Sequence, residues 1–358
     1  MSIFFGKENL LVILIIIGLT LGSIMFYSAS YLKSLVDYGQ KDKIFLDFFK
    51  KVIIGGFFAF ILGVLSGYFW TKTRWLLNLV FIFLFFGLLM LLIFMNAKVK
   101  RWIQIGGLSI QPAELIKPFI ILFGVSIVSG LRHLSFSWRR MLSFWLPTLL
   151  TIVLILLQPA LTNPILILTA MSVVYFSLKP HWKEIVFLFI IVLIIISSSF
   201  IWKYRLERFI AFLKPETEKS FQTNIVKSAI ISGGILGKGL GGSTYKVAGI
   251  PLMLSDSIFG IIGEELGLIG STFIILGFLF FYLYLIKLGN HINHPEGKIF
   301  TYGAVTLFSL QTFIHFAGNI GLIPLTGVVL PFFSAGGSAQ IAFLFSVGLI
   351  KGFYERYS

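Results

Sequence analysis

Long runs of apolar residues, separated by short polar stretches, make up most of this 358-residue chain. A complete run is about twenty residues long, the length that an α-helix needs to cross the ~30 Å hydrocarbon core of a bilayer. The runs are continuous rather than alternating, so they predict helices and not the strands of a barrel. We therefore predict an all-α polytopic membrane protein with about ten transmembrane helices, at residues 10–32, 52–70, 75–97, 111–130, two short spans within 141–178, 185–202, 256–286, 299–321 and 340–350.

Two of the apolar stretches are interrupted. The uncharged run 141–178 is too long for one span, and Pro159 and Pro164 break it near the middle, which predicts a tight hairpin between two short helices. The stretch 322–338 is apolar but rich in proline and glycine. Irregular backbone of this kind must pack against protein or line a cavity when it lies at membrane depth.

The polar stretches between the runs predict the topology. Residues 33–51 and 98–107 are expected to be charged loops, and 203–255 is the only long hydrophilic segment, read as one long extracytoplasmic loop between spans 7 and 8. Ten spans place both ends on one side, and twelve lysines and arginines in the short loops on that side against eight on the other favour cytoplasmic N- and C-termini. We expect residues 1–358 to form a single membrane domain.

The composition supports these predictions. Hydrophobic residues make up 57% of the chain and charged residues 12%, whereas a soluble domain of this length needs far more charge on its surface. The net charge of +15 is scattered over the loops, which favours topology signalling and lipid headgroups over nucleic acid. The chain has no cysteine, so disulfides and thiolate metal sites are excluded. The first apolar run exceeds a typical signal peptide's hydrophobic region, so we expect a retained span.

Three carboxylates open the predicted span at 256–286. Asp256, at its outer end, is either a helix N-cap or a general base at the boundary between water and membrane. Glu264 lies about 80° round an ideal helix and about 12 Å deeper, which would let it line the same cavity, whereas Glu265 faces the opposite side. Because a charge at such depth costs several kcal/mol, each glutamate either shapes a cavity or forms a buried ion pair.

A second charged pair and several loop cations are the other candidates. Glu114 and Lys117 are spaced so that their side chains can face one another near the start of helix 111–130, as a self-neutralising pair or as part of a polar cavity. Lysines and arginines at the outer boundary can bind a diphosphate headgroup or remain solvated. The cations concerned are Arg101, Arg205, Lys227, Lys238 and Lys246.

Other catalytic motifs are missing from the sequence. The glycine-rich run 233–239 lacks the Gly-Lys-Ser/Thr ending of a P-loop. The five histidines show no metal-ligand spacing on a helix, and His315, which lies within a predicted span, is expected in the core. We predict no metal site built from protein side chains.

Six blocks of residues match motifs of a known family, in order along nearly the whole chain. The blocks are Ser28-Ala29-Ser30; Arg101-Trp102-Ile103 with Gln111-Pro112-Ala113-Glu114-Leu115-Ile116-Lys117 (RW…QPSE…K); Tyr204-Arg205 with Arg208 and Ala211-Phe212-Leu213-Lys214-Pro215 (YR..R..AFL.P); Ser232-Gly233-Gly234 to Gly239-Leu240-Gly241; Asp256 to Gly267; and Gly321-Leu322-Ile323-Pro324 with Leu330 to Ser338 (GLLP…LPF.SYGGS). Together they resemble the SEDS family of bacterial cell-wall polymerases, the FtsW/RodA/SpoVE group.

The resemblance implies a glycosyltransferase of the bacterial inner (cytoplasmic) membrane. Such an enzyme polymerises lipid II into glycan strands, in cell division or elongation, and releases undecaprenyl diphosphate. Asp256 would be the catalytic base, and Glu114 and Lys117 match positions that family members need for activity. The implied partner is a class B penicillin-binding protein, a transpeptidase. The candidate substrate-binding residues are Glu114, Lys117, Arg101, Arg205, Lys227 and Lys238.

Cofactor use stays open at this point. The leaving diphosphate must be neutralised by cationic side chains or by a metal. A divalent cation, Mg²⁺ or Mn²⁺, bound to the diphosphate fits the chemistry, and the sequence shows no carboxylate cage that would hold one.

The chain also departs from the family pattern. Leu254-Ser255 stands where His-Thr is usual, Ala160 replaces the acid of QPDLGT, and Ala335 replaces the tyrosine of SYGG. The segment 204–215 leans toward the division-type (FtsW) branch. These departures leave an inactive scaffold as one alternative function. A second alternative is a flippase for lipid-linked precursors, in which Glu264, Glu114 and Lys117 would matter more than Asp256.

Overall fold

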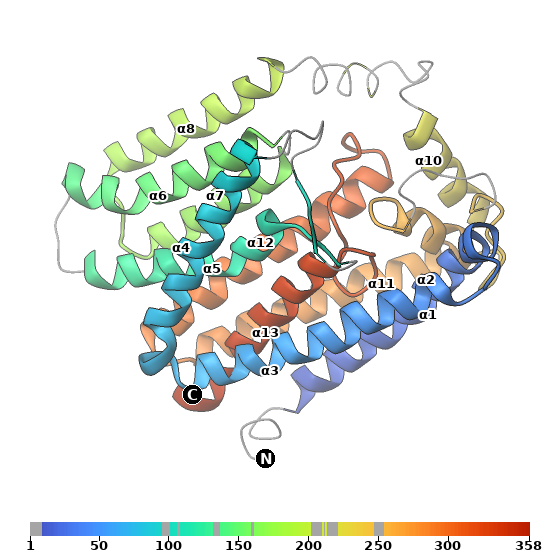
Figure 1. Cartoon of the computed structure of the whole chain (residues 1–358), viewed down its shortest axis with the longest axis horizontal. Coiled ribbons are helices and arrows are strands. Elements are labelled where there is room, and N and C mark those ends of the chain that lie inside the picture. The colour runs from blue at the N-terminus through green and yellow to red at the C-terminus, as the bar shows by residue number, and fades with distance from the viewer. Residues whose placement is uncertain are drawn as a thin grey trace.

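The computed structural model describes residues 9–94, 101–105, 108–131, 137–158, 161–201, 210, 212, 221–246 and 254–358. These residues form a bundle of helices that run roughly along one direction (Figure 1). The elements are α1 (Leu10–Tyr38), α2 (Lys43–Phe49), a π-helical turn (Lys50–Ile54), α3 (Gly55–Tyr68), α4 (Trp70–Phe94), β1 (Ile103–Ile105), β2 (Leu108–Ile110), α5 (Pro112–Leu131), α6 (Trp138–Leu156), α7 (Thr162–Phe176), α8 (Trp182–Ile201), α10 (Phe221–Gly233), α11 (Ile258–His291), α12 (Pro295–Asn319) and α13 (Gly337–Tyr357).

The predicted fold class is confirmed. Within the described residues, seven helices are long and apolar enough to cross a membrane: α1, the continuous run α2–α3, α4, α5, α6, α11 and α12. The shorter α7, together with α8 and α13, coincides with further predicted spans. The chain is thus a multi-pass helical membrane protein, and the count of ten spans stays a prediction.

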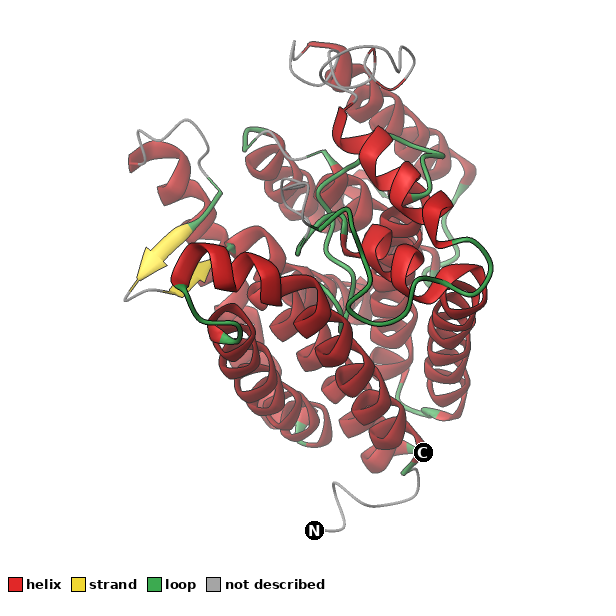
Figure 2. Ribbon diagram, turned by 90° about the vertical axis from the view of Figure 1, so that its right-hand side faces the viewer, coloured by secondary structure: helices red, strands yellow, loops and turns green. Residues whose placement is uncertain are grey.

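Three predicted loops contain regular structure instead. Helix α1 continues to Tyr38 and α2 begins at Lys43, so most of 33–51 is helical. The described part of 98–107 opens a small antiparallel hairpin, β1–β2, seen at the side of the bundle in Figure 2. Helix α10 lies within 203–255. Hydropathy locates only the part of a helix that crosses hydrocarbon, so it does not detect helix that continues into the polar region.

Close contacts between small residues bring α3 and α13 together. A Cβ on Gly63 would lie 2.3 Å from the carbonyl oxygen of Phe345, and a Cβ on Gly352 would lie 2.2 Å from that of Val64. Small residues that let helix backbones approach are typical of packing in membranes, where apolar side chains gain little by leaving lipid. Helices α5 and α12 are the most buried of the candidate spans and occupy the middle of the bundle.

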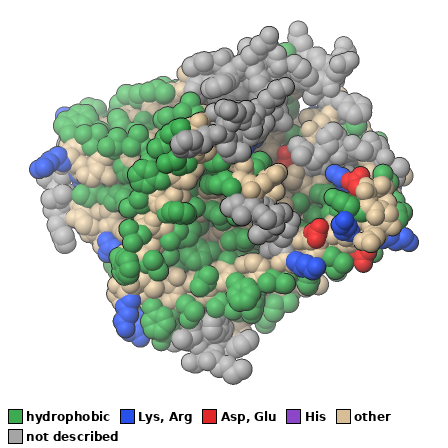
Figure 3. All heavy atoms as spheres, in the orientation of Figure 1, with side chains coloured by type: hydrophobic (Ala, Val, Ile, Leu, Met, Phe, Trp, Pro, Cys, Tyr) green, Lys and Arg blue, Asp and Glu red, His purple; other side chains and the backbone are tan. Residues whose placement is uncertain are grey.

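The start of α1 and the end of α13 lie at the same end of the molecule (Figures 1 and 2). Arg74 of α4 and Glu296 of α12 form a 2.9 Å ion pair, so the starts of these two helices share an end as well. In Figure 3 a broad apolar surface separates charged side chains at the two edges of the view. This distribution suits a bundle that crosses a bilayer.

Helix α11 folds back on itself at Gly267. The rings of Phe259 and Phe278 both pack against Phe316, with centroids 4.7 and 5.8 Å away. In a straight helix the nineteen intervening steps would separate the first two residues by about 28 Å. Gly267 has φ 66° and ψ −165°, a conformation that only glycine adopts readily. The element therefore has a short arm, residues 258–266, and a long arm, residues 268–291.

Candidate functional site

Asp256 lies in a turn that other segments hold through its backbone. The side chain of Asn319 donates to the carbonyl oxygen of Asp256 at 3.0 Å. The hydroxyl of Ser334 donates to the carbonyl of Ser255 at 2.7 Å. The predicted N-cap role is wrong: Ser257 occupies that position, one residue later, and Asp256 remains in the preceding turn, partly buried.

The side chains of Asp256 and Lys227 each pack against a glycine of the segment that follows α12. A Cβ at Gly327 would lie 3.2 Å from Oδ2 of Asp256, and a Cβ at Gly321 would overlap the Lys227 side chain, 2.5 Å from its amine. Lys227 projects from α10, which packs against the short arm of α11 where Val226 contacts Gly260. An acid and a base from distant parts of the sequence thus rest on one segment.

The straight helix expected over 256–286 is wrong, because α11 reverses at Gly267. The sequence placed Asp256 at the outer rim and Glu264 about 12 Å deeper. Because the chain reverses at Gly267, the glutamates lie beside the reversal, and Asp256 lies at the other end of the short arm, ~13 Å away along its axis. A glycine within an apolar run gives no local sign of a reversal, so a single straight helix was the expected outcome.

The two glutamates bind different partners, as the helix geometry predicted. Glu264 is fully buried and pairs with Lys238 at 2.7 Å, while its carboxylate also accepts from Ser243 and Thr244. It therefore does not line a cavity with Asp256. Glu265 pairs with Lys246 at 2.9 Å. Both acids belong to buried ion pairs, which was one of the two roles expected for them.

Ser28 of α1 completes the second ion pair. Its hydroxyl donates to the Glu265 carboxylate at 2.6 and 2.8 Å and accepts from the backbone amide of Gly241 at 3.1 Å. The Lys246 amine also lies 4.9 Å from the centre of the Tyr31 ring. The Ser-Ala-Ser block at the end of the first apolar run thus connects α11 to the glycine-rich loop, residues 234–246.

Backbone hydrogen bonds from this loop replace those that α11 loses at its reversal. The amides of Lys238 and Gly239 donate to the carbonyls of Glu264 and Glu265, each at 3.0 Å. In return, the amide of Leu268 donates to Gly234 at 2.9 Å, and that of Ile269 donates to Ile235 at 3.2 Å. A helix interrupted in a membrane needs such substitutes, because unsatisfied backbone groups are costly there.

Glu114 and Lys117 face one another, as their spacing predicted, at 2.6 Å. The pair is buried among three helices: Asn163 of α7 donates to Glu114 at 2.9 Å, and Lys117 donates to Gln311 of α12 at 2.9 Å. The sequence did not predict that Asn163 and Gln311 belong to this cluster, because an uncharged amide side chain does not stand out within an apolar run. Complete pairing makes a buried ion pair tolerable.

The remaining cationic candidates have different outcomes. Nε of Arg101 donates to the carbonyl of Gln158 at 2.7 Å, which ties the β-hairpin to the end of α6. The Lys227 amine lies 5.8 Å from the ring of Phe212. Arg205, and Ala160 where the family has an acid, lie outside the described residues.

No metal cage is present in the part of the chain that the structure describes, where no three His, Asp or Glu side chains come together. His315 is buried in the core, as expected, and its Nδ1 lies 2.7 Å from the carbonyl oxygen of Val328.

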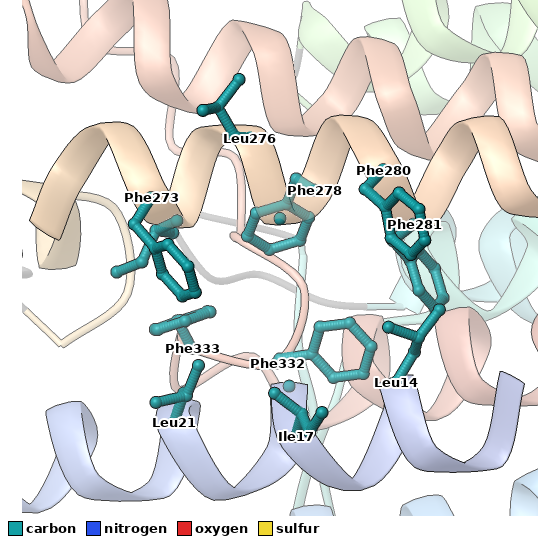
Figure 4. Close-up of a pocket in the computed structure, with 13 residues that line it drawn as sticks. Leu14, Ile17, Leu21, Phe273, Leu276, Phe278, Phe280, Phe281, Phe332 and Phe333 are labelled. Atoms are coloured by element: carbon teal, nitrogen blue, oxygen red, sulfur yellow. The ribbon is translucent and has the colours of Figure 1, made fainter. Parts of the chain in front are cut away.

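An apolar pocket of about 420 Å³ lies between α1 and the long arm of α11. In Figure 4 phenylalanines of α11 face Leu14, Ile17 and Leu21 of α1, and Phe332 and Phe333 form its third wall. This third wall belongs to the segment on which Asp256 rests. The lining suits a hydrocarbon chain and offers nothing to a sugar or a phosphate.

Comparison with known proteins gives consistent matches over almost the whole chain. A profile of the FtsW/RodA/SpoVE family, described as "Cell cycle protein", matches residues 8–355. Stage V sporulation protein E of Bacillus subtilis is 32% identical over 98% of both chains. The probable peptidoglycan glycosyltransferase FtsW of Borreliella burgdorferi is 31% identical over 98% of this chain and 96% of its own.

Solved structures share the fold at lower identity. A chain from a study of polymerisation and crosslinking by a peptidoglycan synthase complex superposes with a TM-score of 0.78 at 22% identity, over 98% of both chains. The rod shape determining protein RodA of Thermus thermophilus superposes with a TM-score of 0.69 at 20% identity, over 98% of this chain and 97% of its own.

Proposed function

The chain belongs to the FtsW/RodA/SpoVE family, and on that premise we propose that it is a peptidoglycan glycosyltransferase of the bacterial inner membrane that polymerises lipid II. The observation that supports the proposal is that Asp256 packs against Gly327 and Lys227 packs against Gly321, two positions of the same segment after α12. A glycosyl transfer to a hydroxyl needs a base for the acceptor and a positive charge for the leaving diphosphate. The segment after α12 contacts one side chain of each kind.

Asp256 is the base in this proposal. Its carboxylate takes the proton of an acceptor sugar hydroxyl while the hydroxyl oxygen bonds to the anomeric carbon of the donor. The bond from that carbon to the diphosphate oxygen breaks, and its electron pair leaves with undecaprenyl diphosphate. The proton then passes from Asp256 to water or to the diphosphate. Base catalysis of this kind contributes roughly 10²- to 10⁴-fold in rate.

Lys227 and Arg101 are the cations that we assign to the diphosphate, and Arg205 keeps the same expectation from its motif. Lys238 receives a different role from the one its sequence suggested. Its amine is bonded to the Glu264 carboxylate, so we assign it to holding the glycine-rich loop rather than to contacting substrate. The apolar pocket beside α1 is the place that we propose for part of the isoprenoid chain.

The proposed product, a glycan strand, implies a second enzyme that crosslinks it. Glycan strands become a wall only when their peptides are crosslinked, and we propose a class B penicillin-binding protein as the transpeptidase that works with this chain. The study containing the TM-score 0.78 match concerns coordination of polymerisation and crosslinking in one synthase complex. Co-purification of the two membrane proteins in detergent tests this part of the proposal independently of catalysis.

The decisive experiment replaces Asp256 with its uncharged isostere. Purified Asp256→Asn should bind lipid II and keep the wild-type thermal unfolding profile, but form no glycan strands on a polymer gel. Polymer formation at the wild-type rate would refute Asp256 as the base. Transport of lipid II across liposomes by the same variant would instead favour the flippase function, although the ion pairs of Glu264 and Glu265 make both glutamates unsuited to moving with a transported substrate.

A further inference from the structure

Three polar side chains follow one face of α12. Gln311, His315 and Asn319 are spaced four residues apart, so they stack along the helix. Each is at most 2% exposed. Polar side chains buried in a membrane helix are costly unless they are hydrogen-bonded. Their placement in a row therefore raises the question of what they hold.

The first two members of the row hold the segment that follows α12. Nε2 of Gln311 donates to the carbonyl of Val329 at 2.8 Å. Nδ1 of His315 lies 2.7 Å from the carbonyl of Val328. Because a carbonyl oxygen only accepts hydrogen bonds, Nδ1 must carry the proton of the imidazole. The two side chains thus fix consecutive peptide units of an otherwise irregular segment.

The third member, Asn319, holds the turn that contains Asp256. Nδ2 of Asn319 donates to the backbone carbonyl of Asp256 at 3.0 Å. Gly327, the residue before Val328, is the one against which the carboxylate of Asp256 rests. The row therefore reaches Asp256 from two sides: Asn319 holds its backbone, and His315 holds the peptide next to the seat of its carboxylate.

We propose that Gln311, His315 and Asn319 form a polar ladder that positions Asp256, and that His315 acts through the proton on Nδ1. This inference rests on the proposed function, since it concerns the placement of the proposed base. The ladder also reaches the second charged pair, because Lys117 donates to Oε1 of Gln311 at 2.9 Å. The Glu114–Lys117 pair and Asp256 are thereby linked along α12 through side chains and backbone carbonyls.

The other nitrogen of His315 offers a rival role that must be separated from positioning. In the described part of the chain, Nε2 of His315 is buried and makes no hydrogen bond, and the same is true of Oδ1 of Asn319. With Nδ1 protonated, a neutral imidazole presents Nε2 as an acceptor. A water molecule or a substrate hydroxyl could donate to Nε2. That role would depend on Nε2, whereas positioning depends on Nδ1.

Two amide substitutions distinguish the two nitrogens. His315→Asn places an amide nitrogen near the position of Nδ1 and can still donate to Val328, whereas His315→Gln places its amide near Nε2. His315→Leu removes both. For polymerisation of purified lipid II, we expect His315→Leu and His315→Gln to lower kcat about 10- to 100-fold at an unchanged KM. His315→Asn should restore kcat to within about threefold of the wild type.

Each alternative result overturns the positioning role. Activity in His315→Gln together with inactivity in His315→Asn would assign the function to Nε2. Wild-type kcat in all three variants would show that the ladder is dispensable, and equal losses accompanied by a lower melting temperature would show a structural role only. Asp256→Asn, measured in parallel, tests the underlying function. If that variant is inactive while His315→Leu is normal, only the present inference fails, whereas an active Asp256→Asn removes the proposed base itself.

Discussion

The carboxylate of Asp256 rests on Gly327, where a Cβ atom would lie 3.2 Å from Oδ2. Gly327 also has φ +73°, a left-handed backbone conformation that strains other residues. The backbone conformation favours glycine at this position, and a Cβ there would also have to push the Asp256 carboxylate aside slightly. The segment that follows α12 therefore determines where the proposed base points.

The first prediction concerns Gly327→Ala, which should lower kcat for glycan polymerisation severalfold. The new Cβ must move the carboxylate by only tenths of an ångström, less than the ~1 Å displacement that can cost about 100-fold. KM should change little, since the added methyl group contacts the proposed base and no group that we assign to substrate binding. The matched control is Gly87→Ala in α4, where a Cβ meets nothing within 4 Å. Equal kcat in the two variants would show that Gly327 does not position Asp256.

Gly267→Ala should destabilise the protein more than any other glycine substitution in α11. A Cβ there would lie 2.3 Å from the amide nitrogen of Gly237, and φ is +66°. We expect a loss of at least ~3 kcal/mol in the free energy of unfolding, because both strain and a backbone clash act at this residue. Gly277→Ala, in the long arm of the same helix with no neighbour within 4 Å, should be nearly neutral. Chemical unfolding in detergent measures both, and comparable stabilities would contradict the folded-back arrangement.

Substitution of Lys246 should lower the free energy of unfolding much more than substitution of Lys238, although the sequence does not distinguish the two lysines. The Lys246 side chain is 1% exposed, and its loss would leave the buried Glu265 carboxylate without a cation and with the Ser28 hydroxyl as its remaining side-chain donor, which costs about 3–5 kcal/mol. Lys238 is 32% exposed, and Glu264 would retain Ser243 and Thr244 as donors, so its loss should cost about 1 kcal/mol. Unfolding free energies of Lys246→Met and Lys238→Met test this order. The reverse order would mean that the loop is held chiefly through Glu264.

A double-mutant cycle separates stability from function at Glu114 and Lys117. Lys117→Met alone leaves a buried carboxylate without its partner, and we expect a loss of about 3–5 kcal/mol. Adding Glu114→Gln removes that charge and should recover most of the stability. Polymerisation should remain impaired in the double variant if the charges serve the reaction. Recovery of both stability and activity would show that the pair only makes the helix tolerable in the membrane.

Local spacing predicted some of these contacts correctly. Gln111-Pro112 marked the start of α5, and the i, i+3 spacing of Glu114 and Lys117 predicted that they face one another, because both depend on residues within one helical turn. The different directions of Glu264 and Glu265, about 100° apart on an ideal helix, followed from the same geometry. Each of these features needs no knowledge of the rest of the chain.

Contacts between distant segments could not be predicted in this way. The reversal at Gly267 depends on backbone groups of residues 234–239, which replace the missing hydrogen bonds of α11. The pairing of Lys238 and Lys246 with the glutamates depends on the same loop. Without knowledge of these loop contacts, a straight helix is the simplest expectation for an apolar run, and a straight helix does not show the reversal between Asp256 and the long arm.

The pocket beside α1 yields the last prediction. Gly277 lines this pocket, and a Cβ there meets nothing within 4 Å, so a larger side chain can enter the pocket without displacing its walls. If part of the isoprenoid chain lies there, Gly277→Phe should raise KM for lipid II severalfold and leave kcat nearly unchanged, because the substitution removes binding that ground state and transition state share. The same substitution at Gly87, which is equally free of neighbours but does not line the pocket, serves as the control. A short-chain analogue of lipid II adds a second test: its KM should be the same for wild type and Gly277→Phe, since a shortened chain does not occupy the pocket. An equal rise in KM for long and short chains would place the isoprenoid elsewhere on the protein.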